Sequence, residues 1–174
     1  GGCQMSYLEN DVREIITKAV IGKGEKETVS KHVIKTPHKP DNILGCWIIN
    51  HVYHAKQRNQ NTVDVNGGFD INVWYAFNDS TKTEVVTEHV NYQDPVTLSV
   101  TDRHTLNKEA DVYAKMTKQP HSIECNINDS DGTIEAEVEK SYLVEVIGDT
   151  KVSVRVDPAS IDDEQFHWYN QNES

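Results

Sequence analysis

The chain has 174 residues, of which 36% are hydrophobic and 26% charged, and its net charge is −11. This length suits one compact domain and is marginal for two. The acidic excess disfavours nucleic acids and anionic membrane surfaces as partners. The sequence contains no run of about 18 apolar residues, so it predicts no membrane span.

The first residues lack the charged and apolar segments of a signal peptide. We interpret Gly1–Gln4 as a cloning remnant and Met5 as the native start, so that residues 1–11 form a flexible N-terminus. The next segment, residues 12–21, is ambiguous. Its apolar residues fit helical spacing, yet Ile15–Ile21 is rich in β-branched side chains. We favour a strand because everything after it has β character.

Strand signals dominate the middle of the chain. Ile43–Tyr53 is rich in β-branched and aromatic residues, and in Phe69–Phe77 the alternate positions are large and apolar. Asn78–Lys82 consists of turn-forming residues, so Thr83–Tyr92 is predicted to return as the second strand of a hairpin. Both sides of Ile43–Tyr53 are partly apolar, which leaves open whether the strand is buried within the subunit or meets another subunit.

The second half continues the pattern. A short strand follows Pro95, a polar loop is expected over 102–109, and Asp131-Gly132 and Gly148-Asp149 are typical of hairpin turns. The remaining strands are predicted over 112–117, 122–128, 133–139, 142–147 and 151–156. The sequence therefore predicts an all-β fold: a single antiparallel β-sandwich-like domain over residues 12–157, with roughly nine or ten strands.

A faint repeat indicates two related halves. Phe69–Thr87 and Tyr142–Val156 both contain a strand, a short turn, Thr-Lys and a second strand. Residues 158–174 differ from the rest because they are acidic and aromatic and lack alternation. We interpret them as a C-terminal tail that could dock a partner through Phe166, Trp168 and Tyr169.

No set of residues predicts catalysis or metal binding. On a strand, His51 and His54 point to opposite faces and cannot share one ion. Asn126–Gly132 resembles a calcium loop but lacks the required acidic positions, so a hairpin turn explains it better. Gly22-Lys23-Gly24 lacks the full phosphate-loop pattern, and no nucleophile–base motif occurs. We therefore predict a non-enzyme with no catalytic, cofactor-binding or metal-binding residues.

Surface chemistry is the more informative signal. Trp47, Ile49 and Tyr53 fall on one side of their strand, and Trp74 is a large aromatic residue on the outer side of another. These four residues are predicted to form a self-association surface. The sparse, odd set of three cysteines fits a reducing compartment rather than a disulfide framework. Cys46 and Cys125 are candidates for an intersubunit cross-link under oxidising conditions, if they are exposed.

Several stretches, in this order and spacing, resemble the bacterial spore outer coat protein CotE family: REIITKAVIGKG from Arg13, NILGCWIINH from Asn42, GFDINVWY from Gly68, TKTEVVTEHV from Thr81 and YLVEVIGDTKVSVRV from Tyr142. The resemblance extends from about Arg13 to Asp157. It implies a structural, non-enzymatic protein without a cofactor, made in the mother-cell cytoplasm and then located in the spore outer coat. Its implied partners are copies of itself and other spore coat proteins, whose assembly it scaffolds. The family's long acidic tail is replaced here by a short, mixed one.

A second class of function stays open beside this one. A β-sandwich could instead bind a ligand, for instance a glycan on Trp47, Trp74 or Trp168.

Overall fold

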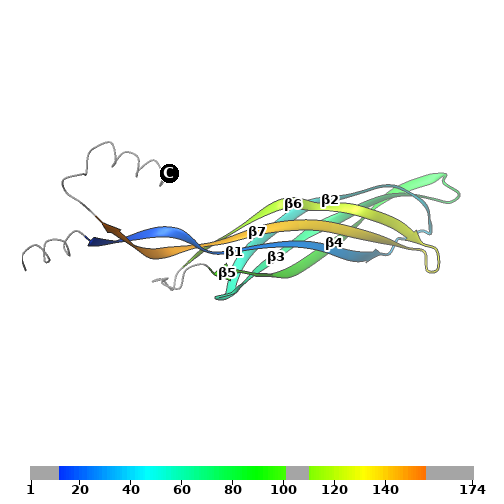
Figure 1. Ribbon diagram of the computed structural model, residues 1–174. Coiled ribbons are helices and arrows are strands. Elements are labelled where there is room, and N and C mark those ends of the chain that lie inside the picture. The colour runs from blue at the N-terminus through cyan, green and yellow to red at the C-terminus, as the bar shows by residue number, and fades with distance from the viewer. Residues whose placement is uncertain (1–11, 101–109, 156–174) are drawn as a thin grey trace, which may run out of the picture.

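The computed structural model describes residues 12–100 and 110–155, which form seven strands in two antiparallel sheets and contain no helix. The strands are β1 (Val12–Ile34), β2 (Pro40–Asn59), β3 (Thr62–Phe77), β4 (Lys82–Thr97), β5 (Ser99–Val100), β6 (Asp111–Asn128) and β7 (Thr133–Arg155). Sheet A has the order β5-β1-β7-β6, and sheet B has the order β2-β3-β4. The two sheets lie face to face as an elongated sandwich (Figure 1). The all-β, sandwich-like prediction is confirmed, including the strand over residues 12–21.

The strands are fewer and longer than expected from the sequence. Segments 133–139, 142–147 and 151–156, which were predicted as three strands, belong to the single strand β7, whose described part ends at Arg155. Gly148-Asp149 is not a hairpin turn, because these two residues pair with Ala19 and Lys18 of β1 in a continuous antiparallel register. The predicted repeat is therefore wrong, since Tyr142–Arg155 contains no turn to match the one between β3 and β4.

Two of the predicted turns are confirmed. The β3–β4 turn places Asn78, Asp79 and Ser80 at positive φ, and the β6–β7 turn places Gly132 at φ 75°. Asn and Asp tolerate this left-handed region better than most residues, and Gly adopts it freely. The predicted loop at 102–109, the tail and the N-terminus lie outside the described residues.

The inner faces of the two sheets form two apolar clusters. The first gathers around Val63, Val65 and Val144, and the second around Phe69, Ile71 and Val138, all of which are fully buried. Burial of such β-branched and aromatic side chains drives the packing of the sheets, at about 25 cal/mol per Å² of apolar surface removed from water.

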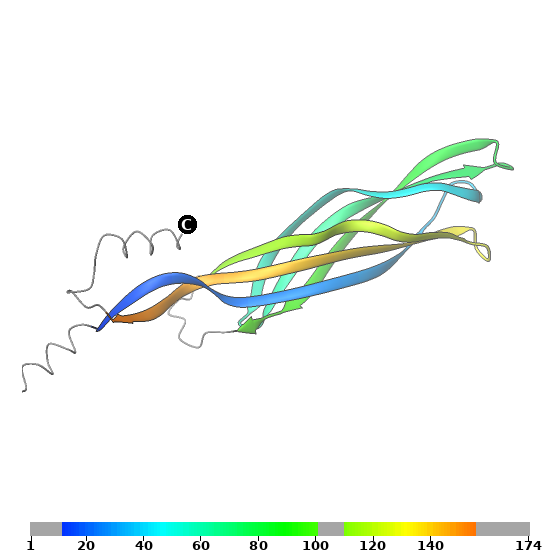
Figure 2. The same cartoon turned by 45° about the horizontal axis from the view of Figure 1, so that its top comes forward.

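One end of the molecule is a two-stranded ribbon. Residues 12–19 of β1 pair with residues 148–155 of β7, and this pairing continues beyond the ends of β5 and β6. The ribbon extends away from the sandwich in both ribbon views (Figures 1 and 2). The opposite end carries the β3–β4 and β6–β7 turns.

Candidate association surface

The outer face of sheet B carries an exposed aromatic patch. Pairing aligns Gly45, Trp74 and Val85 in one cross-strand row, and Trp47, Asn72 and Thr87 in the next. Paired residues of antiparallel strands project their side chains to the same face. These six residues, called the tryptophan face below, carry no charge.

Gly45 sets the shape of this face. A Cβ atom at Gly45 would lie 3.4 Å from Cζ3 of Trp47 and 3.9 Å from Cε3 of Trp74, so both indole rings border the glycine. The exposed fractions are 40% for Trp47, 42% for Trp74 and 51% for Val85. Two neighbouring exposed indoles are typical of a surface that binds a partner. Ile49, which is 40% exposed, extends the patch along β2.

Tyr53 does not join the other three predicted surface residues. Asn50, at φ 57°, lies in a β-bulge between Ile49 and Val52. A bulge shifts the alternation of the strand by one residue. His51 and Tyr53 consequently lie on the inward side of the edge strand β2, where their rings stack 5.1 Å apart and Tyr53 stays 36% exposed.

The inward histidine is held by neighbouring rings. His51 shares a hydrogen bond with the hydroxyl of Tyr92, and its ring lies 5.8 Å from that of Tyr92. Burial lowers the pKa of His51, because a charged imidazolium loses hydration there. His54 is exposed and pairs with Asn66. The two histidines therefore do not converge, and the described residues hold no group of three or more potential metal ligands.

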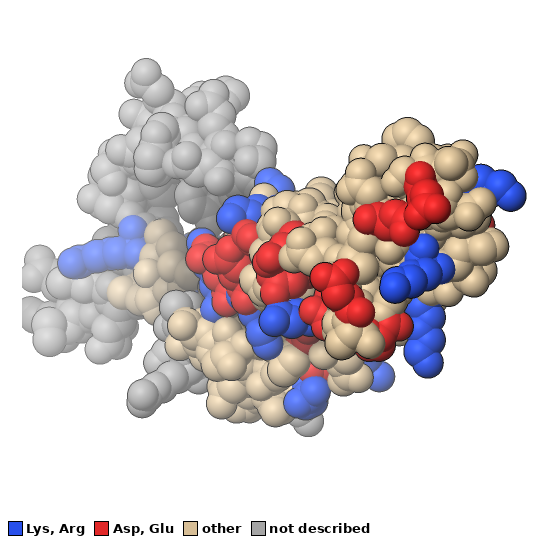
Figure 3. All heavy atoms as spheres, turned by 90° about the vertical axis from the view of Figure 1, so that its right-hand side faces the viewer, with Lys and Arg blue, Asp and Glu red and all other residues tan. Residues whose placement is uncertain are grey.

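The outer face of sheet A differs in charge. Outside the two-stranded ribbon, carboxylates outnumber lysines here, and the charged side chains are Lys23, Glu25, Glu27, Lys31, Asp111, Lys115, Lys118, Glu124, Glu135, Glu137, Glu139 and Glu145. Some of them pair across strands, as Lys118 does with Glu139 at 2.9 Å. Seen from the end that carries the turns, acidic and basic side chains lie interspersed over the surface (Figure 3). The outer face of sheet A thus carries an excess of carboxylates, whereas Asp64 and Asp70 on the outer face of sheet B are paired with Arg58 and His89.

A buried ion pair, which the sequence analysis did not identify, lies between the two sheets. Lys140 is 2% exposed, and its Nζ lies 3.2 Å from Oδ2 of Asp94 and 3.0 Å from Oγ1 of Thr28. The ammonium also lies 4.3 Å from the centre of the Tyr92 ring, as in a cation–π contact. Tyr142 donates a 2.8 Å hydrogen bond to Asp94, and burial is the main cause that raises the pKa of Tyr142. The sequence does contain a pattern that indicates a buried lysine, because Lys140 continues the alternation of Ile134, Ala136 and Val138 at the inward-facing positions of β7.

The two candidate cross-linking cysteines lie together. Cys46 on β2 and Cys125 on β6 are free and half-buried, and both pack against the buried cluster around Phe69 and Val138. Hydrogen bonds from Cys125 and Ser122 lower the pKa of Cys46. The pKa of Cys125 is raised, because it would lose its proton beside the Cys46 sulfur and in a partly buried site.

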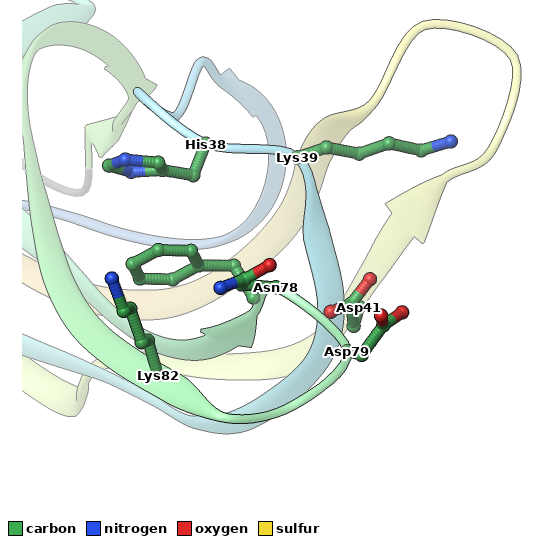
Figure 4. Close-up of a pocket in the computed structure, with 7 residues that line it drawn as sticks. His38, Lys39, Asp41, Asn78, Asp79 and Lys82 are labelled. Carbon is green, nitrogen blue, oxygen red and sulfur yellow. The ribbon is translucent and has the colours of Figure 1, made fainter.

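A shallow pocket of about 410 Å³ lies at the turn end of the sandwich (Figure 4). The His38 ring stacks on Phe77 at 4.1 Å, and the Asp41 carboxylate accepts a 3.1 Å hydrogen bond from the Ser80 N–H. These groups support the left-handed β3–β4 turn. The remaining lining residues are Lys39, Asn78, Asp79 and Lys82. These lining residues carry charges of both signs and include no nucleophile–base pair. They therefore indicate neither a catalytic site nor a particular ligand. The predicted docking residues Phe166, Trp168 and Tyr169 lie outside the described residues.

The fold and the outer faces of its two sheets define the class of protein: this is an antiparallel β-sandwich protein whose two outer faces differ in charge. The chain belongs to the outer spore coat protein E (CotE) family, whose model matches residues 11–174. It is therefore a spore coat protein of a structural family, and that family is located in the outer coat. Searches of curated proteins and of solved structures found no match. The described residues include no helix that could cross a membrane.

Proposed function

We propose that this protein is a structural subunit that self-associates through the tryptophan face and scaffolds assembly of the outer coat. In this proposal it is made in the mother-cell cytoplasm and binds copies of itself and other coat proteins. The observation that carries the proposal is an exposed, uncharged aromatic face, centred on Trp47 and Trp74, on a chain with a net charge of −11.

Charge favours this face over the opposite one. Two copies that met through the outer face of sheet A would bring Glu135, Glu137 and Glu139 against the same carboxylates of the other copy, and like charges in close contact are unfavourable. Two copies that met through the tryptophan face would bury indole rings and Val85, and Asp70 beside Ile49 is already paired with His89 in its own subunit. We therefore assign copy-to-copy contact to sheet B, with Trp47, Ile49, Trp74 and Val85 at its centre.

The charged face then stays available to other proteins. In a face-to-face pair through sheet B, both sheet A faces point outward. Their carboxylates would suit basic segments of other coat proteins. We keep the C-terminal residues Phe166, Trp168 and Tyr169 as a proposed docking segment for such partners.

The test compares two matched valines. Val85 is 51% exposed on the outer face of sheet B, and Val29 is 56% exposed on the outer face of sheet A. Sedimentation velocity over a concentration series should show that Val85→Lys weakens self-association by at least about tenfold, since a buried lysine in the contact is costly. Val29→Lys should leave association within about twofold of the parent chain.

Two results would argue against the proposal. One is a parent chain that stays monomeric at high concentration; the other is an equal loss of association in both variants. Circular dichroism of each variant checks that the sandwich still forms. Negative-stain electron microscopy of the parent chain shows whether the assemblies are closed or extended.

The same two indoles support a second candidate, a glycan-binding module. Neighbouring exposed aromatic rings can stack on sugar rings, and Trp47 and Trp74 lie side by side about Gly45. Binding on a glycan array that is lost in Trp74→Ala would favour this function. An array without binding, together with large particles in sedimentation, would favour the structural role.

A further inference from the structure

The seam between the edge strands β2 and β6 brings two cysteines together. Cys46 pairs with Val73 on β3, and Cys125 pairs with Ala136 on β7. Val73 and Ala136 are both fully buried, so the cysteines share the inward-facing side of their sheets. Both cysteines pack, from opposite sheets, against the apolar cluster around Phe69 and Val138.

The two side chains pack against the same buried cluster from opposite sheets. The proximity of the two thiols is also the main influence on their ionisation: Cys125 lowers the pKa of Cys46, and Cys46 raises the pKa of Cys125. Both cysteines are half-buried, and each lies on an edge strand of its sheet. A small reagent can therefore approach them from the side of the sandwich.

We propose that Cys46 and Cys125 form an intramolecular disulfide that joins the two sheets when the protein meets a low-molecular-weight disulfide of the glutathione type. This modification is independent of self-association, because the seam lies at the side of the sandwich and not on the tryptophan face. It differs from the intersubunit cross-link expected from the sequence, since each thiol already has a partner within its own subunit.

The reaction proceeds in two exchange steps. The Cys46 thiol loses its proton to solvent, and its sulfur attacks one sulfur of oxidised glutathione; the glutathione S–S bond breaks and one glutathione leaves as a thiol. Cys125 then loses its proton and attacks the Cys46 sulfur of the mixed disulfide, which releases the second glutathione. The two protein thiols are oxidised by two electrons, and the reagent is reduced to two thiols. The low pKa of Cys46 makes it the better first nucleophile.

Closure should change stability and reactivity together. A bond between residues so far apart in the chain restricts the unfolded state, and we expect the midpoint of thermal unfolding to rise by roughly 5–15 °C. The second exchange step should be at least about tenfold faster in the folded protein than in urea, because the fold holds the sulfurs together.

The experiment uses the full chain carrying Cys3→Ser, which removes the cysteine outside the described residues. The protein is treated with oxidised glutathione, alkylated and analysed by non-reducing gel, intact mass and peptide mapping. The expected product is a monomer that has lost both alkylatable thiols, migrates faster than the reduced chain and yields one peptide pair joined through Cys46 and Cys125. Added Cys46→Ser or Cys125→Ser should each stop at a glutathione adduct on the remaining thiol.

Three results would overturn the proposal. They are covalent dimers as the main product, glutathione adducts on both cysteines of the Cys3→Ser chain, and equal closure rates in buffer and in urea. The mapping and rate measurements use the chain with both thiols, so they stay informative even if a serine variant folds poorly.

Discussion

Replacing Lys140 by methionine tests the buried ion pair, because methionine keeps the length of the side chain and removes its charge. The change leaves Asp94 without the ammonium 3.2 Å away, while Tyr142 still donates its 2.8 Å hydrogen bond. Removal of one partner from a buried pair costs about 3–5 kcal/mol. Because the Asp94 side chain keeps 18% exposure and one donor, we expect a loss of about 2–3 kcal/mol. Urea unfolding measures this directly, and the midpoint of thermal unfolding should fall by roughly 4–12 °C.

The matched control is Lys118→Met. Lys118 forms a 2.9 Å pair with Glu139, but its side chain is 55% exposed, so its loss should cost far less stability than the loss of Lys140. Combining Lys140→Met with Asp94→Asn should recover most of the lost stability, since no unpaired charge remains in the core. Equal losses from Lys140→Met and Lys118→Met would refute the reasoning, because they would show that burial of the lysine carries no energetic weight.

Four further predictions follow from contacts in the described residues. Lys140→Met should raise the pKa of His32, which burial and then the nearby Lys140 charge both lower; histidine NMR titration measures it, and an unchanged value would contradict the placement. Gly24→Ala should cost about 1–3 kcal/mol in urea unfolding, because its Cβ would lie 2.5 Å from the Thr97 carbonyl oxygen, whereas Gly22→Ala, whose nearest neighbour lies at 3.5 Å, should cost far less. The Asp70 carboxylate lies 2.6 Å from His89 and raises the pKa of that imidazole. The protonated His89 therefore contributes its full stabilisation below about pH 6.5, and this stabilisation is lost as the pH rises through the raised pKa. Asp70→Asn should lower the pKa of His89 measured by NMR, and an unchanged pKa would rule the pair out. Self-association should strengthen between about 0.01 and 0.15 M salt, because screening weakens repulsion between copies of charge −11; weaker sedimentation-measured association would indicate ion pairs across the contact instead.

Alternation along the chain predicted the fold class, because a two-residue period is a local property. In Phe69–Phe77 the alternate large residues are indeed the buried ones, apart from the partly buried Phe77. The number of strands, in contrast, depends on pairing between distant parts of the chain. Gly148-Asp149 has turn-forming residues, yet its pairing with β1 outweighs that preference. A single sequence does not show which distant strand will supply the hydrogen bonds.

The candidate sites show the same division between local and distant information. Trp47 and Trp74 were found as outward aromatic residues, but their meeting about Gly45 depends on the register between β2 and β3. Tyr53 was placed with them because the bulge at Asn50 has no sequence signal strong enough to predict it. The proximity of Cys46 and Cys125 depends on how the two sheets pack, and the spacing of residues in the sequence does not predict this packing.

The distribution of charge explains how an acidic chain could associate with itself at all. Uniform spreading of 28 carboxylates would make every contact between copies repulsive. Among the described residues, carboxylates outnumber lysines on the outer face of sheet A, where lysines such as Lys118 and Lys31 pair with only some of them. The outer face of sheet B keeps a neutral centre around Trp74, and its Asp70 is matched by His89. Contact through sheet B would leave both the acidic faces and the cysteine seam exposed at the same time. Self-association, recruitment of basic partners and closure of the disulfide would then use three separate surfaces, so a substitution in one should leave the other two measurable.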